Sequence, residues 1–283
     1  MIATVSRRLG AVGFVLATGL VHAHAAEASA WDGDARSAVR IIAGAPTRPD
    51  GKTLRAGVEI RLAPGWKTYW RYPGDSGVPP RFDFAQSSNV QSATLHWPSP
   101  HRFGDANSQS IGYEGSVIFP VEVEARDPAR PVTLRLKLDY AVCEKLCVPA
   151  DGNVELLLAA GPAATANDLT LAAAEARVPK PSQVGDDATL AIRSVRQEIG
   201  ARFPRIVVDV AAPGDAKVDL FAEGPTPDWA LPLPAPVDGG APGLRRFAFD
   251  LDGVPPGATT QGATLTFTAV TDGSAIEAKV RLD

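Results

Sequence analysis

The sequence predicts an all-β protein made of two β-sandwich domains in tandem. Apolar and polar residues alternate along 132–142, where every second side chain is apolar, as in a half-buried strand. The 25 prolines and 26 glycines are spread between apolar runs, so they mark turns rather than disorder. Many short strands separated by turn residues are typical of a sandwich.

Apolar runs with strand character recur along the chain. They cover residues 54–62, 117–123, 132–142, 154–158, 206–210, 247–251, 265–270 and 278–282. One stretch, 163–177, has helical character, with Asn167 and Asp168 as a cap, and it leads into Pro179-Lys180-Pro181-Ser182. We therefore expect a first domain at 27–162, a linker at 163–187 and a second domain at 188–283.

The N-terminus has the pattern of a secretion signal over residues 1–26. Arg7 and Arg8 precede an apolar run from Leu9 to Val21, and Ala23-His24-Ala25 fits the small-x-small pattern of a cleavage site. The apolar run is too short for a membrane span, so no direct membrane insertion is expected. Export predicts a periplasmic location, where disulfides persist.

The net charge argues against a nucleic-acid partner. It is −4 for the whole chain, and it becomes −6 when Arg7 and Arg8 are removed with the signal. Acidic and basic residues are interspersed, and no block of Lys and Arg forms a phosphate-binding stripe or a patch for anionic lipid.

The chain has two cysteines, Cys143 and Cys147, separated by Glu144-Lys145-Leu146. A disulfide closing so short a loop removes unfolded-chain entropy worth about 2 kcal/mol, against roughly 4.7 kcal/mol for a 100-residue loop. Stabilisation of the fold is therefore a weak reason for such a bridge. Exchange of electrons with other thiols is a stronger one, because exposed bridges are the labile ones.

The spacing also predicts the local structure of the cysteine pair. A fully extended chain would separate the two Cα atoms by about 13 Å, whereas a disulfide needs roughly 4.4–6.8 Å. We therefore expect a hairpin with its tip at 144–146 and one sulfur on each arm. Pro149 suits an edge strand. Lys145 would favour a thiolate, while Glu144 would oppose it.

Two other interpretations of the cysteines remain open from these residues alone. The bridge could be a permanent structural disulfide near a sheet edge. Alternatively, the two thiolates with His96 and His101 would make a tetrahedral metal site, although the spacing differs from the Cys-x-x-Cys pattern of zinc knuckles.

Several pieces of the first half occur in an order that resembles a known family. They are residues 64–79, Trp97-Pro98, Arg102-Phe103, Gly112-Tyr113-Glu114-Gly115, Phe119-Pro120-Val121 and the segment from Tyr140 to Pro149. Together, over about residues 35–160, they resemble the N-terminal periplasmic domain of DsbD-type disulfide reductases, and most closely the ScsB-like branch. In that branch a second domain follows, and residues 219–232 are similar to it.

The resemblance implies two immunoglobulin-like β-sandwiches and a role in electron transfer between thiols. Such a protein takes two electrons from a membrane-embedded thiol partner and passes them to oxidised periplasmic proteins. Cys143 and Cys147 would be the redox pair, with Cys147 forming the mixed disulfide and Cys143 resolving it. The cysteine spacing is shorter here than in the best-known DsbD.

The resemblance also implies a cap loop that shields the cysteines. Its counterpart would lie within 102–113, with Phe103 and Tyr113 as candidates. Tyr140, in the cysteine segment, is a further candidate to flank the thiols, beside the Glu144 and Lys145 already considered.

Two functional hypotheses follow. The first is a periplasmic protein-disulfide reductase component that needs no small-molecule cofactor, with thioredoxin-like or cytochrome c maturation proteins as acceptors. The membrane and thioredoxin domains of DsbD have no counterpart before Asp283, so separate proteins would supply them, or the domain would serve another purpose. The second hypothesis is a non-redox β-sandwich that binds or scaffolds another periplasmic protein, with a structural disulfide.

Overall fold

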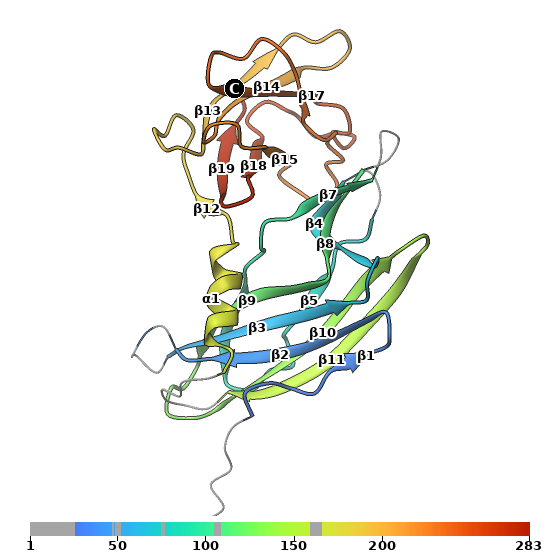
Figure 1. Ribbon diagram of the computed structural model, residues 1–283, viewed down its shortest axis with the longest axis vertical. Coiled ribbons are helices and arrows are strands. Elements are labelled where there is room, and N and C mark those ends of the chain that lie inside the picture. Colours follow the sequence, from blue (N-terminus) through green and yellow to red (C-terminus); the bar gives the residue numbers. More distant parts are fainter. Residues whose placement is uncertain (1–25, 47, 49–51, 75–76, 105–108, 159–165) are drawn as a thin grey trace, which may run out of the picture.

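The computed structural model describes residues 26–46, 48, 52–74, 77–104, 109–158 and 166–283, and it consists of two β-sandwiches joined through one short helix (Figure 1). The predicted all-β fold is confirmed. Except for Ala26, the predicted signal lies outside the described residues. Within the described residues, no helix has the length and apolar character needed to cross a membrane.

Two antiparallel sheets form the first sandwich. One sheet contains, in spatial order, β1 (Asp32–Gly33), β2 (Ser37–Gly44), β3 (Thr53–Leu62), β9 (Ser116–Ala125) and β6 (Val90–Leu95). The other contains β11 (Cys147–Leu158), β10 (Val132–Cys143), β4 (Lys67–Gly74), β8 (Gln109–Glu114) and β7 (His101–Gly104), with β5 (Arg81–Asp83) paired to β10. Inward-facing apolar residues of both sheets, such as Phe119 and Leu138, form the core.

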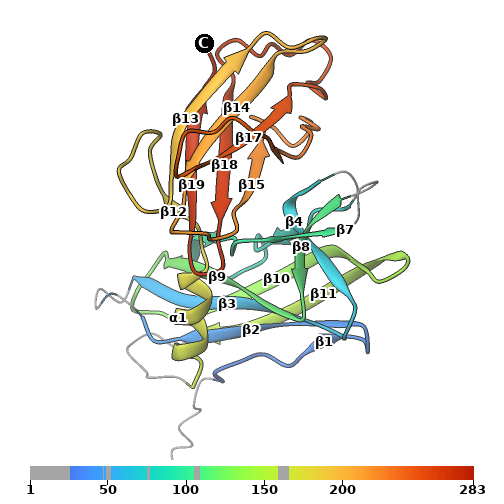
Figure 2. The same cartoon turned by 45° about the horizontal axis from the view of Figure 1, so that its top comes forward.

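The second sandwich also has two sheets, whose strands are labelled in Figure 2. One contains β12 (Lys180–Pro181), β19 (Ala275–Arg281), β18 (Thr264–Val270) and β15 (Asp219–Glu223). The other contains β13 (Ala191–Glu198), β14 (Arg205–Ala211), β17 (Leu244–Asp250) and β16 (Ala235–Pro236). Phe221 and Phe267 are fully buried in its core.

The predicted strands lie within observed strands, apart from single residues at two C-terminal ends. The periodicity rule finds strands with one buried face and one exposed face, as in β10. It does not find β4, in which Thr68, Tyr69 and Trp70 are buried in succession. Both faces of that strand are covered, so its apolar residues do not alternate with polar ones.

The predicted helical segment forms α1 (Asp168–Ala176), which begins after Asn167. The helix packs on the first sandwich. Leu171 is completely buried, and the small size of Gly44 and Gly57 leaves room for its side chain. Arg55 binds Glu175 at 2.6 Å and Asp168 at 3.2 Å. The residues between the sandwiches are therefore held against the first one, and β12 already belongs to a sheet of the second.

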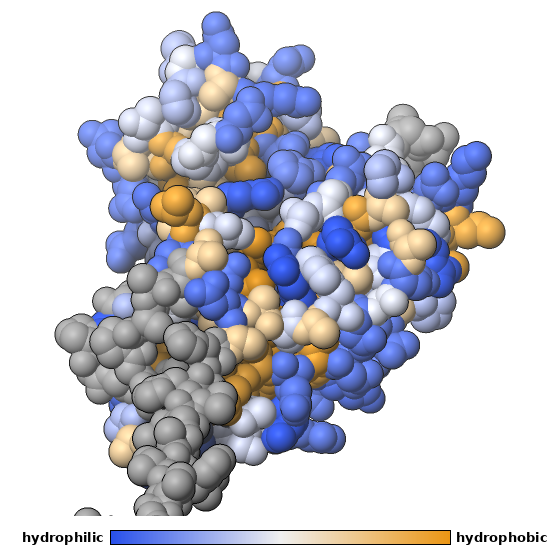
Figure 3. Space-filling view, turned by 60° about the horizontal axis from the view of Figure 1, so that its bottom comes forward, coloured by the Kyte–Doolittle hydropathy of each residue, from blue (hydrophilic) through white to orange (hydrophobic). Residues whose placement is uncertain are grey.

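The surface seen in Figure 3 is mostly hydrophilic, with smaller groups of apolar residues between the polar ones. Among the described residues, six large apolar side chains are exposed. They are Val78, Leu146, Leu157, Leu169, Val184 and Ile199. Leu146 is 79% exposed and lies between the two cysteines in sequence.

Candidate functional site

The two cysteines close the hairpin formed by β10 and β11. The two twelve-residue strands pair in register along their whole length, ending with Cys143 opposite Cys147. Residues 144–146 form the tip, as the sequence predicts. The cysteines are joined by a disulfide, and their Cα atoms lie 4.1 Å apart. Every backbone pair of the hairpin thus helps to hold the two sulfurs in one place.

The two sulfur-bearing residues differ in their exposure to solvent. Cys143 is only 8% exposed because β10 is an inner strand, with β4 on its other side. Cys147 is exposed because β11 is the edge strand of its sheet, where Pro149 also lies. A thiolate from another protein therefore meets the Cys147 sulfur first.

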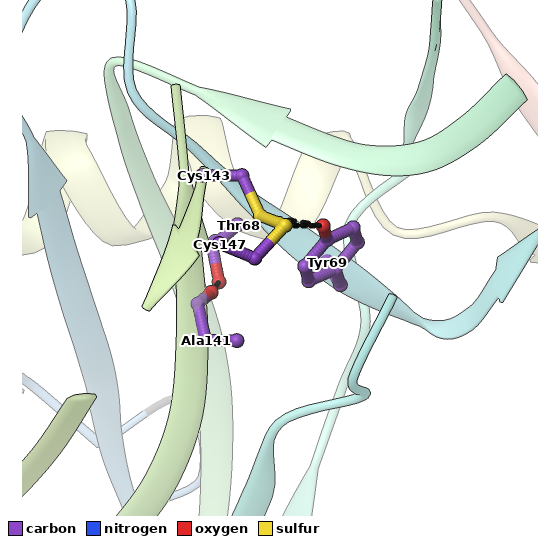
Figure 4. Close-up of a disulfide and its surroundings, with 5 residues drawn as sticks. All are labelled: Thr68, Tyr69, Ala141, Cys143 and Cys147. Carbon is purple, nitrogen blue, oxygen red and sulfur yellow. Dashed lines mark hydrogen bonds between the residues drawn. A yellow bond between two sulfur atoms is a disulfide. The ribbon is translucent and has the colours of Figure 1, made fainter. Parts of the chain in front are cut away.

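Tyr69 on β4 contacts both sulfurs (Figure 4). Its hydroxyl oxygen lies 2.6 Å from Cys143 Sγ and 2.9 Å from Cys147 Sγ. The tyrosine is 5% exposed and packs with Cys143 and Ala141. Burial raises the pKa of Tyr69 above its ordinary value, so the phenol stays protonated at neutral pH. Its O–H is then available as a donor to a sulfur.

The pairing of β4 with β10 explains why Tyr69 reaches the disulfide. Lys67 stands opposite Cys143, and Thr68 stands opposite Val142. Because side chains alternate along a strand, Lys67 and Tyr69 share the face that carries Cys143. Thr68 points the other way, where its buried hydroxyl donates to the Ala141 carbonyl oxygen at 3.0 Å and fixes the register.

Two glycines leave room for Tyr69. Gly112 on β8 stands opposite the tyrosine, and a Cβ there would lie 1.9 Å from the Thr68 carbonyl oxygen. Gly77 has a φ of 151°, and a Cβ there would lie 2.5 Å from the Tyr69 ring. A side chain at either position would displace the strand or the ring.

The cap-loop candidate Phe103 lies on the disulfide face. It is on β7, and its ring centroid is 4.7 Å from the Lys67 ammonium, whose residue pairs with Cys143. Residues 105–108, in the middle of the predicted cap loop, lie outside the described part of the chain. Phe103 therefore marks where the cap would begin, at one edge of the site.

The candidates Tyr113 and Tyr140 are not brought to the sulfurs. Tyr113 is 1% exposed in the core, where its hydroxyl donates to the Pro98 carbonyl oxygen at 2.8 Å. Tyr140 is also buried, and its hydroxyl bonds Ser37 Oγ at 2.8 Å. Both follow from strand alternation: Tyr113 shares the face of Thr68, and Tyr140 lies an odd number of residues before Cys143.

The hairpin tip presents charged side chains to solvent. Glu144 and Lys145 are both exposed, so their opposite charges act on the sulfurs through water. Lys67, on the neighbouring strand, is held 3.5 Å from Glu114. The positive charge of Lys67, on the disulfide face, is thus partly neutralised.

The described residues contain no group of three or more His, Cys, Asp or Glu side chains placed to hold a metal ion. His101 on β7 instead has its Nε2 3.4 Å from the Arg177 guanidinium. His96 lines a cavity of about 300 Å³ with Arg55, Glu122 and Glu175, at the side of the sandwich covered by α1.

A comparison with protein families gives a match that includes both cysteines. Residues 39–159 match the family model for the N-terminal domain of the thiol:disulfide interchange protein DsbD. Over those residues the resemblance seen in the sequence is confirmed. Among curated protein sequences, none matches this chain significantly.

A solved structure has the same fold over nearly the whole chain. It is the N-terminal periplasmic domain of ScsB from Proteus mirabilis, at 23% sequence identity and a TM-score of 0.69. The alignment covers 90% of this chain and 98% of that one, so both sandwiches are included. The family match and the Cys143–Cys147 disulfide together support a thiol:disulfide interchange module.

Proposed function

We propose that this protein is a periplasmic protein-disulfide reductase module. It takes two electrons from a membrane-embedded thiol donor and passes them to oxidised periplasmic proteins with thioredoxin-like or cytochrome c maturation roles. The observation that carries the proposal is the disulfide that joins the exposed residue Cys147 to the buried Cys143 and is contacted by the Tyr69 hydroxyl. The family match over residues 39–159 and the signal-like N-terminus support it.

Loading with electrons begins with attack on the exposed sulfur. A donor thiolate attacks Cys147 Sγ, the Cys143–Cys147 bond breaks, and Cys143 leaves as a thiolate. The second donor thiolate then attacks the donor sulfur of this mixed disulfide and releases Cys147. The donor is oxidised to a disulfide, and the module holds two reduced cysteines.

Unloading follows the same path in reverse. The Cys147 thiolate attacks an acceptor disulfide, and one acceptor sulfur leaves as a thiolate that takes up a proton. Cys143 then attacks Cys147 Sγ, releases the second acceptor thiol and restores the disulfide. Two electrons and two protons pass to the acceptor in each cycle.

Tyr69 has a direct part in both half-reactions. When Cys143 leaves as a thiolate it is buried, and a buried anion without a partner is costly. The Tyr69 hydroxyl, 2.6 Å from that sulfur, donates a hydrogen bond to the developing charge. The 2.9 Å contact with Cys147 Sγ gives the attacking thiolate the same donor.

Trapping a partner tests the proposal. A Cys143→Ala variant keeps the exposed sulfur but lacks the resolving thiol, so it should accumulate mixed disulfides with periplasmic proteins. A Cys147→Ala variant should trap far less, because Cys143 is buried. If neither variant forms a mixed disulfide and the native bridge resists thiol buffers, the protein is a binding or scaffold module with a structural disulfide.

A further inference from the structure

The second sandwich contacts the strand that carries Tyr69, and the contact begins at the next residue. The ring centroid of Trp70 lies 5.6 Å from that of Phe221 on β15. The Tyr72 hydroxyl donates to the carbonyl oxygens of Trp229 and Leu231, each at 2.9 Å. One apolar core runs through this contact from the first sandwich to the second.

Arg71 joins the same segment to two strands of the second sandwich. Its Nη2 lies 2.7 Å from Glu223 Oε1 on β15, and its Nε donates to Glu223 Oε2 at 2.9 Å. Nη2 also pairs with Glu277 on β19. The Glu223 side chain is 15% exposed, so this ion pair is shielded from solvent.

The β4 residues that contact the second sandwich are those that leave the ladder with β8. Tyr69 pairs with Gly112, but the next paired residue is Gly74, opposite Ser110. Residues 70–73 therefore stand opposite Ile111 alone. The segment thus forms a bulge in β4, and the second sandwich contacts this bulge through Trp70, Arg71 and Tyr72.

We infer that the second sandwich is a positioning element for the dithiol. By holding residues 70–73, it fixes the end of β4 and so keeps the Tyr69 hydroxyl at the two sulfurs. Arg71 and Tyr72 are the positioning residues. The inference deepens the proposed function, since the thiolate that Tyr69 stabilises is the one that function needs.

The test compares thiol ionisation in the reduced full-length protein with and without the Arg71 contacts. In a Glu223→Ala/Glu277→Ala variant, the lower thiol pKa of the pair should rise by about 0.5–1, as expected for a weakened hydrogen bond to a thiolate. Removing two carboxylates without moving Tyr69 would instead lower the thiol pKa, because less negative charge would oppose the thiolate. The sign of the change therefore identifies the cause.

Two further variants complete this test. Glu59→Ala is the matched control, because Glu59 is 14% exposed and pairs with Arg40 at 2.7 Å on a different sheet; it should leave the thiol pKa unchanged. Tyr72→Phe alters no charge and removes only the hydroxyl bound to Trp229 and Leu231. It should also raise the thiol pKa. This variant keeps the inference testable if the double glutamate variant does not fold.

Repeating these substitutions in a Tyr69→Phe variant shows whether the rise in thiol pKa depends on the Tyr69 hydroxyl. In that background neither the Tyr72→Phe nor the glutamate variants should shift the thiol pKa further. An unchanged or lowered thiol pKa in Tyr72→Phe, or an equal rise without the Tyr69 hydroxyl, would overturn the inference. Because the cysteines are reduced chemically, the result does not depend on whether the protein exchanges electrons with any partner.

Discussion

The Tyr69 hydroxyl oxygen lies 2.6 Å from the Cys143 sulfur, although 74 positions separate the two residues in sequence. The pairing of β4 with β10 brings them together. The buried Cys143 thus has a neutral donor beside its sulfur, while its partner Cys147 lies exposed on the edge strand. This division between a shielded and an accessible sulfur is the basis of the proposed exchange.

Replacing Tyr69 by Phe should make the thiols less acidic and the pair more reducing. The reduced form loses a donor to its thiolate, so we expect a thiol pKa higher by about 0.5–1 and a reduction potential lower by about 20 mV. The pH dependence of alkylation measures the first, and equilibrium in thiol buffers measures the second. A variant with wild-type values for both would remove Tyr69 from the mechanism.

The two thiols of the reduced protein should differ in reactivity. Cys147 should be alkylated several-fold faster than Cys143, because Cys143 is 8% exposed and packs against Tyr69. Timed alkylation followed by peptide mass spectrometry measures each rate. Equal rates would contradict the assignment of Cys147 as the sulfur that meets other proteins.

The exposed Leu146 should serve partner docking rather than folding. It is 79% exposed beside Cys147, so a partner whose sulfur reaches Cys147 must cover it. We expect Leu146→Ser to change the free energy of unfolding by less than about 0.5 kcal/mol and to slow exchange with a trapped partner. Leu157→Ser, at the far end of β11, is the control and should leave the exchange rate unchanged. Equal slowing in both variants would argue against docking at the tip.

Helix α1 should contribute to stability without affecting the thiols. Leu171→Ala removes a fully buried side chain and should lower the free energy of unfolding by about 2–4 kcal/mol. Leu169→Ala, on the same helix but 86% exposed, should change it little. Urea denaturation gives both values. A large loss in Leu169→Ala, or none in Leu171→Ala, would contradict the packing of this helix.

The second sandwich should lose stability in acid through Asp209. Hydrogen bonds from Arg246, outweighing the effect of burial, lower the pKa of this carboxyl to about 2 from an ordinary 3.8. A lowered pKa in the folded state stabilises the protein above pH 4, and this stabilisation is lost as the pH falls towards 2. The loss should reach about 2 kcal/mol, and Asp209→Asn should abolish it. Unfolding curves at pH 7 and pH 2.5 compare the wild-type protein with the Asp209→Asn variant. The same loss of stability in both would show that Asp209 is not its cause.

Local patterns in the sequence were sufficient to predict the sandwiches and the cysteine hairpin. The alternation along 132–142 and the turn between Cys143 and Cys147 depend on neighbouring residues only. The contact of Tyr69 with the sulfurs depends on which strand lies beside β10, and no local pattern shows that. The sequence alone therefore does not distinguish Tyr69 from its aromatic neighbours Trp66, Trp70 and Tyr72.

Strand register explains why only some of the flanking candidates share the face of the disulfide. Phe103 and Tyr113 fall within one predicted loop, yet they lie on two strands, β7 and β8, and on opposite faces of the sheet. A change of one residue in register would exchange the faces. The interface between the sandwiches could not be predicted from the sequence either, because aromatic residues such as Trp70 and Tyr72 are equally common in the core of a single domain.

The redox equilibrium of the purified full-length protein in graded thiol buffers tests the central claim most directly. A working pair predicts a reversible transition with a reduction potential above about −270 mV, within reach of exchange with other thiol proteins. A bridge that stays oxidised below about −300 mV would be a structural disulfide, and it would contradict the proposal that this protein carries electrons.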